Sequence, residues 1–504
     1  MGIVFRQSAK TSIIVVLGAL LGAFIIWLST KYIPDKHQFG YIQNLTNNAV
    51  VLSQILLLGL NYTLAVYIHK FANNDRKRKL FLTLCLLLPA IIAGIGIIIY
   101  FLLRSWILHH FQPEDMYYMQ RYFMWLPVYI LLFIYQVILE QYLGSQLKVA
   151  LAAFMREVVL RIVNIIIILL FAFQYIDFST LVISTVLMYL IPVIIFFIIS
   201  LKTDAFGFSF DLNSFSKAEY KEMLHFSWYH FLLNMVIILM AGMDMLLLPF
   251  YDHKGFGSLA VYRVAVFFVV ILQLPSKALL PASFTVLAKA FAANDNDKSK
   301  DLFTRASINI LIPTVGIAIL LCCNLNNAVA VIQNGYSEII PIFLILFIGR
   351  IVDCATGMND QVLSITNHYK FNFYLSLFLT VILFVMIRIL VPRYGIYGAA
   401  WSTTVTIVIF NIAKYFFVWK KLDMQPFSNK TVLVVIAALP ALAAGYFFPY
   451  LFNPARHVYV HSFIDAIMRS TVIIIIYLLM LLWLKPSKDL EEYVASIKKN
   501  KRLF

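Results

Sequence analysis

The sequence predicts an all-α polytopic membrane protein with about 14 transmembrane helices. Of the 504 residues, 62% are hydrophobic and only 13% are charged, and the mean hydropathy is +0.86. A soluble chain is nearer half apolar and a quarter charged. The apolar residues form long runs, and most of the 40 lysines and arginines gather in every second loop between them. A soluble enzyme is therefore excluded, and the net charge of +16 indicates membrane topology rather than nucleic acid binding.

Fourteen apolar runs, bounded by charged or turn residues, make up the predicted helices. They lie at about 12–30, 44–69, 79–103, 119–143, 147–172, 177–201, 220–249, 257–289, 302–325, 337–365, 371–393, 396–420, 429–452 and 462–484. The first run follows Arg6 and Lys10 and has no small-residue cleavage pattern behind it, so we interpret it as a retained helix. The eighth run contains Pro275 and Pro281, which predicts a bent helix.

The positions of the basic residues predict the orientation. One side of the membrane receives the basic clusters, including Arg6 and Lys10, the run 76–79, the group 289–305, the tail after 485, and Lys414 with Lys420, Lys421 and Lys430. The opposite loops hold few basic residues. We therefore expect both termini in the cytoplasm, and we expect the run 76–79 to contact anionic lipid headgroups.

Similar segments recur about 220 residues apart and predict an internal repeat. The matching pairs are Phe39-Gly40 with Phe256-Gly257, Phe71-Ala72-Asn73-Asn74-Asp75 with Phe291-Ala292-Ala293-Asn294-Asp295, Glu140-Gln141 with Asp360-Gln361, and Lys148 with Lys370. The repeat predicts two homologous six-helix bundles. Because each bundle has an even number of helices, both face the same way across the membrane, and the repeat is of the parallel kind. The predicted divisions are an N-terminal bundle at 1–202, a C-terminal bundle at 203–421, helices 13 and 14 at 422–485, and a basic cytoplasmic tail at 486–504.

Charged residues inside the predicted spans are the candidate site, because a charge in mid-membrane persists only when it is paired or faces a wet cavity. The fifth helix holds Arg156, Glu157, Arg161 and Asn164, and the last three share one face. Arg161 lies roughly 21 Å from the cytoplasmic end of this helix.

The other candidates lie on helices 8 and 10. Helix 8 supplies Arg263 and Lys277, and helix 10 carries Arg350 and Asp353 one turn apart. Two interpretations stay open. The pairs are either buried ion pairs that fix helix packing or part of a basic cleft, whose surplus positive charge attracts a diphosphate or an acidic sugar.

Four further charged positions have weaker interpretations. Asp244 on helix 7 is either a carboxylate that couples transport to an ion or a boundary residue near the outer end. Glu140 and Asp360, which the repeat equates, are candidates for a gate or hinge or belong to a solvated face. We expect Arg469 to snorkel to the outer interface.

The sequence resembles the Wzx-type polysaccharide flippases (O-antigen and capsule) of the MOP superfamily, which also contains the MATE drug exporters and the peptidoglycan lipid flippase. The resemblance covers about residues 5–425. It rests on Arg6-Gln7-Ser8 with Gly18 and Gly22, Gln38-Phe39-Gly40-Tyr41, Leu58-Gly59-Leu60 through Tyr67-Ile68, Tyr262-Arg263-Val264-Ala265, Leu274-Pro275, Leu280-Pro281, Lys289-Ala290-Phe291 and Tyr394-Gly395-Ile396-Tyr397-Gly398-Ala399-Ala400. It implies a V-shaped, MATE-like fold.

The resemblance also implies a function. The expected activity is export of a polyprenyl-diphosphate-linked oligosaccharide across the bacterial inner membrane for surface polysaccharide, including lipopolysaccharide O-antigen. The expected partners are this lipid-linked substrate, membrane lipids, H⁺ or Na⁺ as a coupling ion, and other polysaccharide-assembly membrane proteins. We expect no catalytic residue, cofactor, metal or nucleic acid.

Two other function classes compete. A MATE-like ion-coupled exporter of small molecules would need a cavity rich in acids to bind cationic drugs. A membrane-embedded polysaccharide polymerase or ligase would need a large outer loop with paired carboxylates. The longest outer loop, about 104–118, offers only Glu114-Asp115, with His109-His110 nearby as a remote metal-site candidate. The chain has no glycine-rich phosphate loop, so ATP is not the expected energy source.

Overall fold

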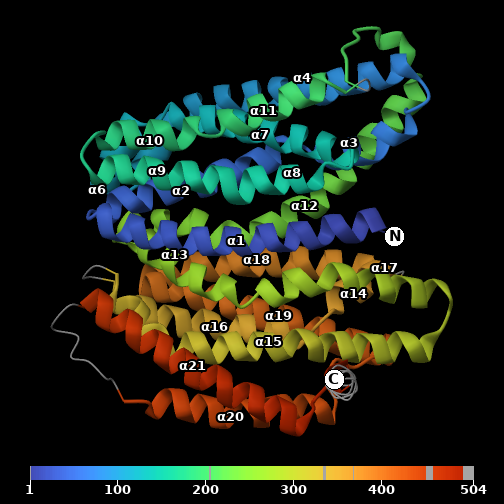
Figure 1. The fold of residues 1–504 in the computed structure, drawn as a ribbon. Coiled ribbons are helices and arrows are strands. Elements are labelled where there is room, and N and C mark those ends of the chain that lie inside the picture. The colour runs from blue at the N-terminus through green and yellow to red at the C-terminus, as the bar shows by residue number, and fades with distance from the viewer. Residues whose placement is uncertain are drawn as a thin grey trace. The chain divides into compact units, whose positions relative to one another are not determined.

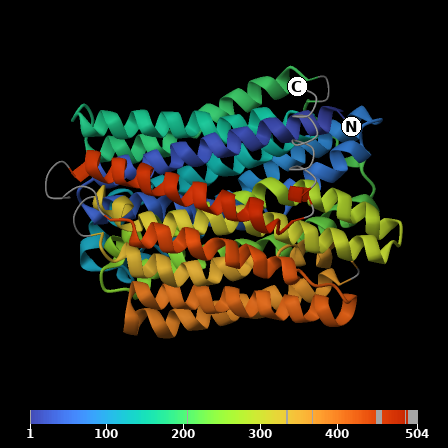
Figure 2. The ribbon, with the colours of Figure 1, turned by 60° about the horizontal axis from the view of Figure 1, so that its bottom comes forward.

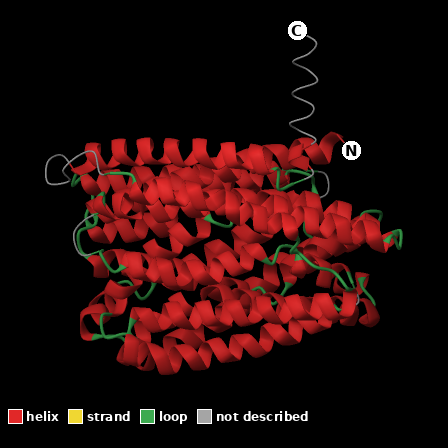
Figure 3. Cartoon of the chain, turned by 90° about the horizontal axis from the view of Figure 1, so that it is seen from below, coloured by secondary structure: helices red, strands yellow, loops and turns green. Residues whose placement is uncertain are grey.

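The computed structural model describes residues 2–203, 206–332, 336–366, 368–449, 458–487 and 489–491. The side chains of residues 2–13, 16, 282, 369, 458 and 459 lie outside this description. The predicted cues at Arg6 and Lys10, and most of the basic tail, therefore fall outside the described side chains. Every regular element of the described residues is helical, as Figure 3 shows.

The chain packs as two compact units. The first unit comprises Met1–Arg263 with Ile387–Ile396, and the second comprises Val264–Met386 with Tyr397–Phe504. These units are defined by packing. The predicted repeat boundaries at 202 and 421 stay a prediction.

The first unit is built around α7, which packs against α2, α3, α4, α8, α10 and α11. Its elements are α1 (Gly2–Tyr32), α2 (Lys36–Leu56), α3 (Leu60–Lys70), α4 (Asp75–Leu102), α5 (Arg104–His109), α6 (Pro113–Arg121), α7 (Trp125–Ser145), α8 (Val149–Phe154), a π-helical turn (Met155–Val159), α9 (Leu160–Ala172), α10 (Phe178–Leu187), α11 (Leu190–Leu201), a 3₁₀ turn (Leu212–Ser214), α12 (Lys217–Tyr251) and the start of α13 (Gly255–Ile271). Figure 1 labels most of these helices and colours them in chain order. On α7, Tyr129, Ile134 and Leu143 are fully buried, so this helix carries the core of the unit.

The second unit is built around α15, which packs against α14, α16, α20 and α21. Its helices are the end of α13, then α14 (Leu274–Ala292), α15 (Asn296–Ala330), α16 (Ile339–Ala355), α17 (Asn359–Ile365), most of α18 (Tyr369–Tyr394), α19 (Ile396–Leu422), α20 (Asn429–Phe447) and α21 (Val458–Leu484). The last two helices pack on each other as well as on α15 (Figure 2). The predicted helices 13 and 14 correspond to α20 and α21. They are therefore anchored by their packing on α15, which contains the ninth predicted span.

The predicted spans coincide with helices throughout the described residues. Among the described residues, nine helical stretches are long and apolar enough to cross a membrane, one of them being the run Phe178–Leu201 that joins α10 and α11, and up to twelve spans result if each of three bent pairs is one span. The all-helical membrane fold is confirmed, and the count of fourteen stays a prediction. The predicted first span lies within α1, and the predicted fifth span corresponds to the run from α8 to α9, where charged side chains interrupt the apolar pattern.

Two of the bent pairs are the second helices of the two predicted repeats. The α2–α3 pair bends by 49° and the α13–α14 pair by 45°. The second bend confirms the expected bent eighth span, and Pro275 lies in the first turn of α14, where its missing N–H costs nothing. At the first bend, Gly59 has a positive φ of 77° and lies so close to α12 that a Cβ atom would be 2.2 Å from the carbonyl oxygen of Ser227. Only glycine fits this contact.

Candidate functional site

A chain of ion pairs occupies the fifth predicted span of the first unit. Arg156 is ion-paired with Glu140 of α7, and its Nε lies 3.2 Å from Oε1 of Glu157. The other oxygen of Glu157 accepts a hydrogen bond from Nη2 of Arg161 at 2.6 Å. The pairing of Glu157 with Arg161, which their i,i+4 spacing suggests, is thus present in the structure. The structure adds Glu140, a residue predicted to act separately as a gate or hinge.

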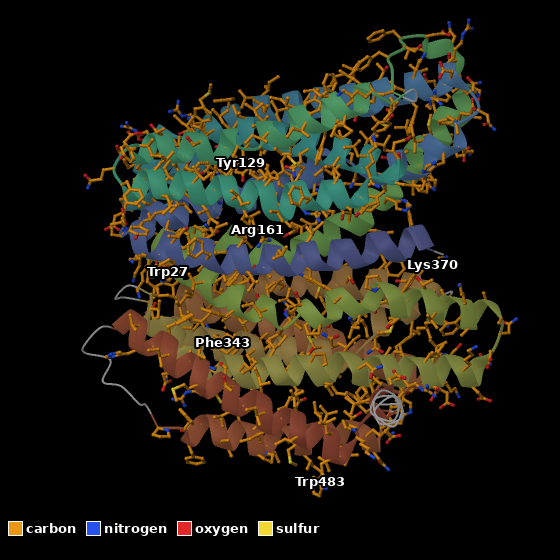
Figure 4. All side chains as sticks on the ribbon, viewed as in Figure 1. Trp27, Tyr129, Arg161, Phe343, Lys370 and Trp483 are labelled. Atoms are coloured by element: carbon orange, nitrogen blue, oxygen red, sulfur yellow. The ribbon has the colours of Figure 1, made fainter. Side chains whose placement is uncertain are left out.

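This chain of ion pairs also connects to α1. Arg161, labelled in Figure 4, donates from Nη1 to the backbone carbonyl of Gly18. A Cβ atom at Gly18 would lie 2.8 Å from Oε2 and 2.9 Å from Cβ of Glu157, so glycine allows the close approach of α1 to the π-helical turn that carries Glu157. The π-helical turn Met155–Val159 carries both Arg156 and Glu157, and such turns occur frequently at functional sites. Asn164 is half-buried one turn beyond Arg161.

A second polar cluster in the first unit contains Asp244. This carboxylate is 5% exposed and accepts a hydrogen bond from the Tyr262 hydroxyl at 2.6 Å. The neighbouring residue, Arg263, donates from Nε to Oε1 of Gln43 on α2 at 3.0 Å. Asp244 is therefore buried between helices rather than exposed at a boundary.

The candidate residues of the second unit meet between α14, α16 and α19. Asp353 accepts hydrogen bonds from Arg350 Nη1 at 3.2 Å, from Asn411 Nδ2 at 3.2 Å and from Gln273 Nε2 at 3.4 Å. The Nε of Arg350 is buried without a hydrogen-bond partner among the described residues. Lys277 is exposed one turn beyond Gln273 on α14. Sequence reasoning missed Asn411 and Gln273, because uncharged amides give no strong signal in a span.

Asp360 of α17 pairs with a buried lysine of α19. Lys414 donates from Nζ to Oδ2 of Asp360 at 2.9 Å, and its side chain is only 1% exposed. The Nζ also lies 3.8 Å from the ring centroid of Phe410. The side of the membrane predicted for Lys414 stays a prediction; the structure shows that α19 continues to Leu422 and carries this lysine inside the helix packing.

The expectation that Arg469 snorkels to the outer interface is wrong. Its side chain is 2% exposed and pairs with Asp465, one turn earlier on α21, at 3.1 Å. Nη1 of Arg469 donates to the carbonyl of Gly445 on α20 at 2.6 Å, and Asn327 of α15 donates to Asp465 at 2.6 Å. This ion pair ties α20 and α21 to α15. The spacing of Asp465 and Arg469 within an apolar run is the sequence signal that could have found it.

A third group that sequence reasoning missed lies where α2, α6 and α13 meet in the first unit. Nδ1 of His37 lies 2.7 Å from Oδ1 of Asp115, and the backbone N–H of Phe256 donates to Oδ2 at 2.8 Å. Burial raises the pKa of the Asp115 carboxyl, and the hydrogen bonds from His37 and Phe256 oppose this rise. Within the described part of the chain, no three histidine, cysteine or acidic side chains gather as a metal site.

The cationic surplus is smaller than the sequence predicts. In the first unit, Arg156 and Arg161 face Glu140 and Glu157, so this group is neutral as a whole. Arg350 is likewise paired with Asp353. These arginines are therefore ion-paired, and only some of their N–H groups remain available as hydrogen-bond donors. An anion would have to compete with the carboxylates for them.

The fold is known from solved structures of membrane transporters. Lipid II flippase MurJ, in an inward closed conformation, matches with a TM-score of 0.73 and 17% identity, over 93% of this chain and 97% of that one. An inward-facing multidrug resistance MATE transporter of the MOP superfamily matches with a TM-score of 0.65 and 14% identity, over 82% and 94%. A MOP superfamily transporter from Pyrococcus furiosus Vc1, described as having a binding pocket of reverse polarity, matches at 0.58 and 13%, over 83% and 96%.

These likenesses confirm the expected MATE-like fold. At identities of 13–17% they establish the architecture alone. No protein-family model matches the sequence, and no curated protein sequence matches it.

Proposed function

We propose that this protein is a flippase that moves a polyprenyl-diphosphate-linked oligosaccharide from the cytoplasmic to the outer leaflet by alternating access. The observation that supports the proposal most is the likeness in fold to lipid II flippase MurJ over almost the whole of both chains. The proposed setting is the bacterial inner membrane, with both termini in the cytoplasm. The oligosaccharide belongs to a surface polysaccharide, and other membrane proteins of its assembly are the proposed partners.

Arginine chemistry supports a diphosphate as the recognised group. Arg161, Arg263 and Arg350 lie within the helices of the two units, and their planar guanidinium groups match phosphate oxygens better than a lysine ammonium does. The unpartnered Nε of Arg350 is a buried donor that an anionic substrate can satisfy. We propose Arg156, Asn164 and Lys277 as further contacts, and Glu157 and Asp353 as the acids that hold the arginines in place.

The membrane potential gives the proposed transport its direction. With the cell interior negative, outward movement of an anion is favourable by roughly 2.3 kcal/mol per charge per 100 mV. A diphosphate can therefore be exported by the potential alone. Ion coupling is the competing hypothesis, and the buried carboxylate of Asp244 is its candidate residue.

A MATE-like exporter of small molecules is the alternative function. The observation that favours it is the hydrogen bond from the Tyr262 hydroxyl to the buried carboxylate of Asp244. A buried carboxylate of this kind could bind a proton and a cationic substrate in turn. A membrane-embedded polymerase or ligase is a weaker alternative, since Asp115 of the acidic pair in the longest predicted outer loop is buried and hydrogen-bonded to His37 and Phe256.

A leaflet-resolved assay of lipid-linked oligosaccharide tests the proposal. Cells that lack this protein are complemented with wild type, with Arg161→Gln/Arg350→Gln, or with Arg393→Gln, which removes an exposed arginine at the end of α18. We expect the intermediate to build up on the cytoplasmic leaflet without the protein. Wild type and Arg393→Gln should clear it, and the double variant should fail at equal membrane abundance. Normal arrival in the outer leaflet without the protein, in cells with no second flippase, would contradict the proposal.

A further inference from the structure

The first three turns of α12 present a groove that the proposed function does not use. Its lining residues all come from one face of the helix and recur every three or four positions, as Lys217, Tyr220, Lys221, Leu224, His225 and Trp228. Lys217, Lys221 and Trp228 are exposed. The groove is therefore a surface feature of one helix rather than part of the arginine clusters.

The opposite face of the same turns packs on the first unit and carries the acidic residues. Glu219 lies 2.6 Å from the Nζ of Lys77, and Glu222 lies 2.8 Å from the Nζ of Lys70. One turn further, Ser227 donates to the carbonyl of Leu58 at 2.7 Å. Both glutamates are thus neutralised by lysines of other helices and turned away from the groove.

This arrangement separates the charges of α12. Lys217, Lys221 and His225 have no acidic partner within 4.0 Å among the described residues, although Glu219 and Glu222 lie close to them in sequence. Neither glutamate stands three or four residues from Lys217 or Lys221, so the helix itself offers these lysines no acidic partner on their own face. The separation leaves two permanent positive charges on an exposed aromatic face.

The residues also change character along the helix axis. Lys217, Lys221 and His225 occupy a stretch of roughly 12 Å, with Leu224 near its end, and Trp228 lies about 5 Å beyond it. Leu224 and Trp228 are exposed by 62% and 54%. A phospholipid has the same order, with a charged phosphate followed by apolar chains, and tryptophan is typical of the boundary between the two.

We propose that this face of α12 binds an anionic phospholipid in the leaflet where α12 begins. The phosphate lies among Lys217, Lys221 and His225, and the acyl chains lie along Leu224 and Trp228. Charge complementarity selects an anionic headgroup over a zwitterionic one, because a choline or ethanolamine cation would meet the same lysines. The inference is independent of the transported substrate.

Tryptophan quenching by brominated lipids tests this site in the full-length protein. The protein is reconstituted into vesicles of equal parts phosphatidylglycerol and phosphatidylcholine, with either one or the other lipid brominated on its acyl chains. The chain has 7 tryptophans, so the difference between wild type and Trp228→Phe isolates the Trp228 signal. We expect brominated phosphatidylglycerol to quench this signal at least about twofold more than brominated phosphatidylcholine.

Charge variants separate the groove from general surface charge. Lys217→Gln/Lys221→Gln should make the two brominated lipids equally effective. The matched control, Lys420→Gln/Lys421→Gln, removes two exposed lysines from the end of α19 and should leave the preference unchanged. Equal quenching in wild type, or an undiminished preference in the groove variant, would overturn the proposal. Loss of the preference when one equivalent of a polyprenyl diphosphate is added would also overturn it, because the groove would then be a substrate site.

Discussion

Lys414 of α19 and Asp360 of α17 form an ion pair whose partners differ sharply in exposure. The lysine side chain is 1% exposed, whereas that of Asp360 is 46% exposed. The predicted repeat equates Asp360 with Glu140, which pairs with Arg156 of the π-helical turn. Each acid thus binds a base from another helix of its own unit, but the two bases come from different places in the predicted repeat.

The unequal exposure predicts unequal costs of mutation at this pair. Asp360→Asn leaves a buried ammonium without its counter-charge and should destabilise the protein by about 3 kcal/mol. Lys414→Met leaves a carboxylate that water reaches, and should cost less than about 1 kcal/mol. Thermal unfolding in detergent measures both, and the double variant should be more stable than Asp360→Asn alone. Equal losses in the two single variants would contradict the asymmetry.

Glycine-to-alanine exchange at two helix positions should give effects of opposite sign. Gly18→Ala places a methyl group against Glu157 and should push α1 away from α9, with a loss of about 1–3 kcal/mol. Gly94→Ala, inside α4, meets no atom within 4 Å and should gain about 0.5–1 kcal/mol from helix propensity. The melting temperatures of the two variants, compared with wild type, test the prediction. A neutral Gly18→Ala variant would show that α1 is not held at this contact.

The raised pKa of Asp115 predicts how stability depends on pH. A carboxyl group whose pKa lies above 3.8 in the folded protein binds its proton more tightly than in the unfolded chain. Its contribution is fully present below about pH 3.8 and is lost as the pH rises through the folded-state pKa. The Asp115→Asn variant has no carboxyl group at this position, so its stability does not fall with rising pH for this reason. The melting temperature of the variant minus that of wild type should therefore increase as the pH rises from 3.8 through the raised pKa of Asp115.

A pH-independent difference would show that Asp115 titrates normally. Asp177→Asn is a suitable control. The carboxylate of Asp177 caps α10 by accepting from the N–H and hydroxyl of Thr180, and these bonds lower its pKa. Stability from this group is present above its unfolded pKa and is lost on acidification. The variant-minus-wild-type difference should consequently fall with rising pH over the acidic range, opposite in sign to that of Asp115→Asn.

Transport by potential alone predicts that Asp244 is dispensable for coupling. Asp244→Asn keeps an oxygen for the Tyr262 hydroxyl and should retain at least about half of the flipping rate in vesicles with an imposed potential. Collapse of the potential should abolish transport in both proteins. Transport that persists without a potential, requires a Na⁺ or H⁺ gradient and disappears in Asp244→Asn would instead establish the ion-coupled alternative.

The sequence determined the elements of this protein, because hydrophobic runs of span length are local in the chain and a bilayer admits helices almost exclusively. The bend at Pro275 and the pairing of Glu157 with Arg161 were likewise predictable, since both depend on spacing within one helix. The tertiary structure alone decided which charges meet. Lys414 and its partner Asp360 lie on different helices, and Arg156 meets Glu140 of α7 in the same way, so helix rotation and packing bring these charges together. The orientation of α12 also depends on tertiary contacts. The ion pairs of Glu219 with Lys77 and of Glu222 with Lys70 turn one face of the helix toward the other helices and leave the face with Lys217 and Lys221 outward.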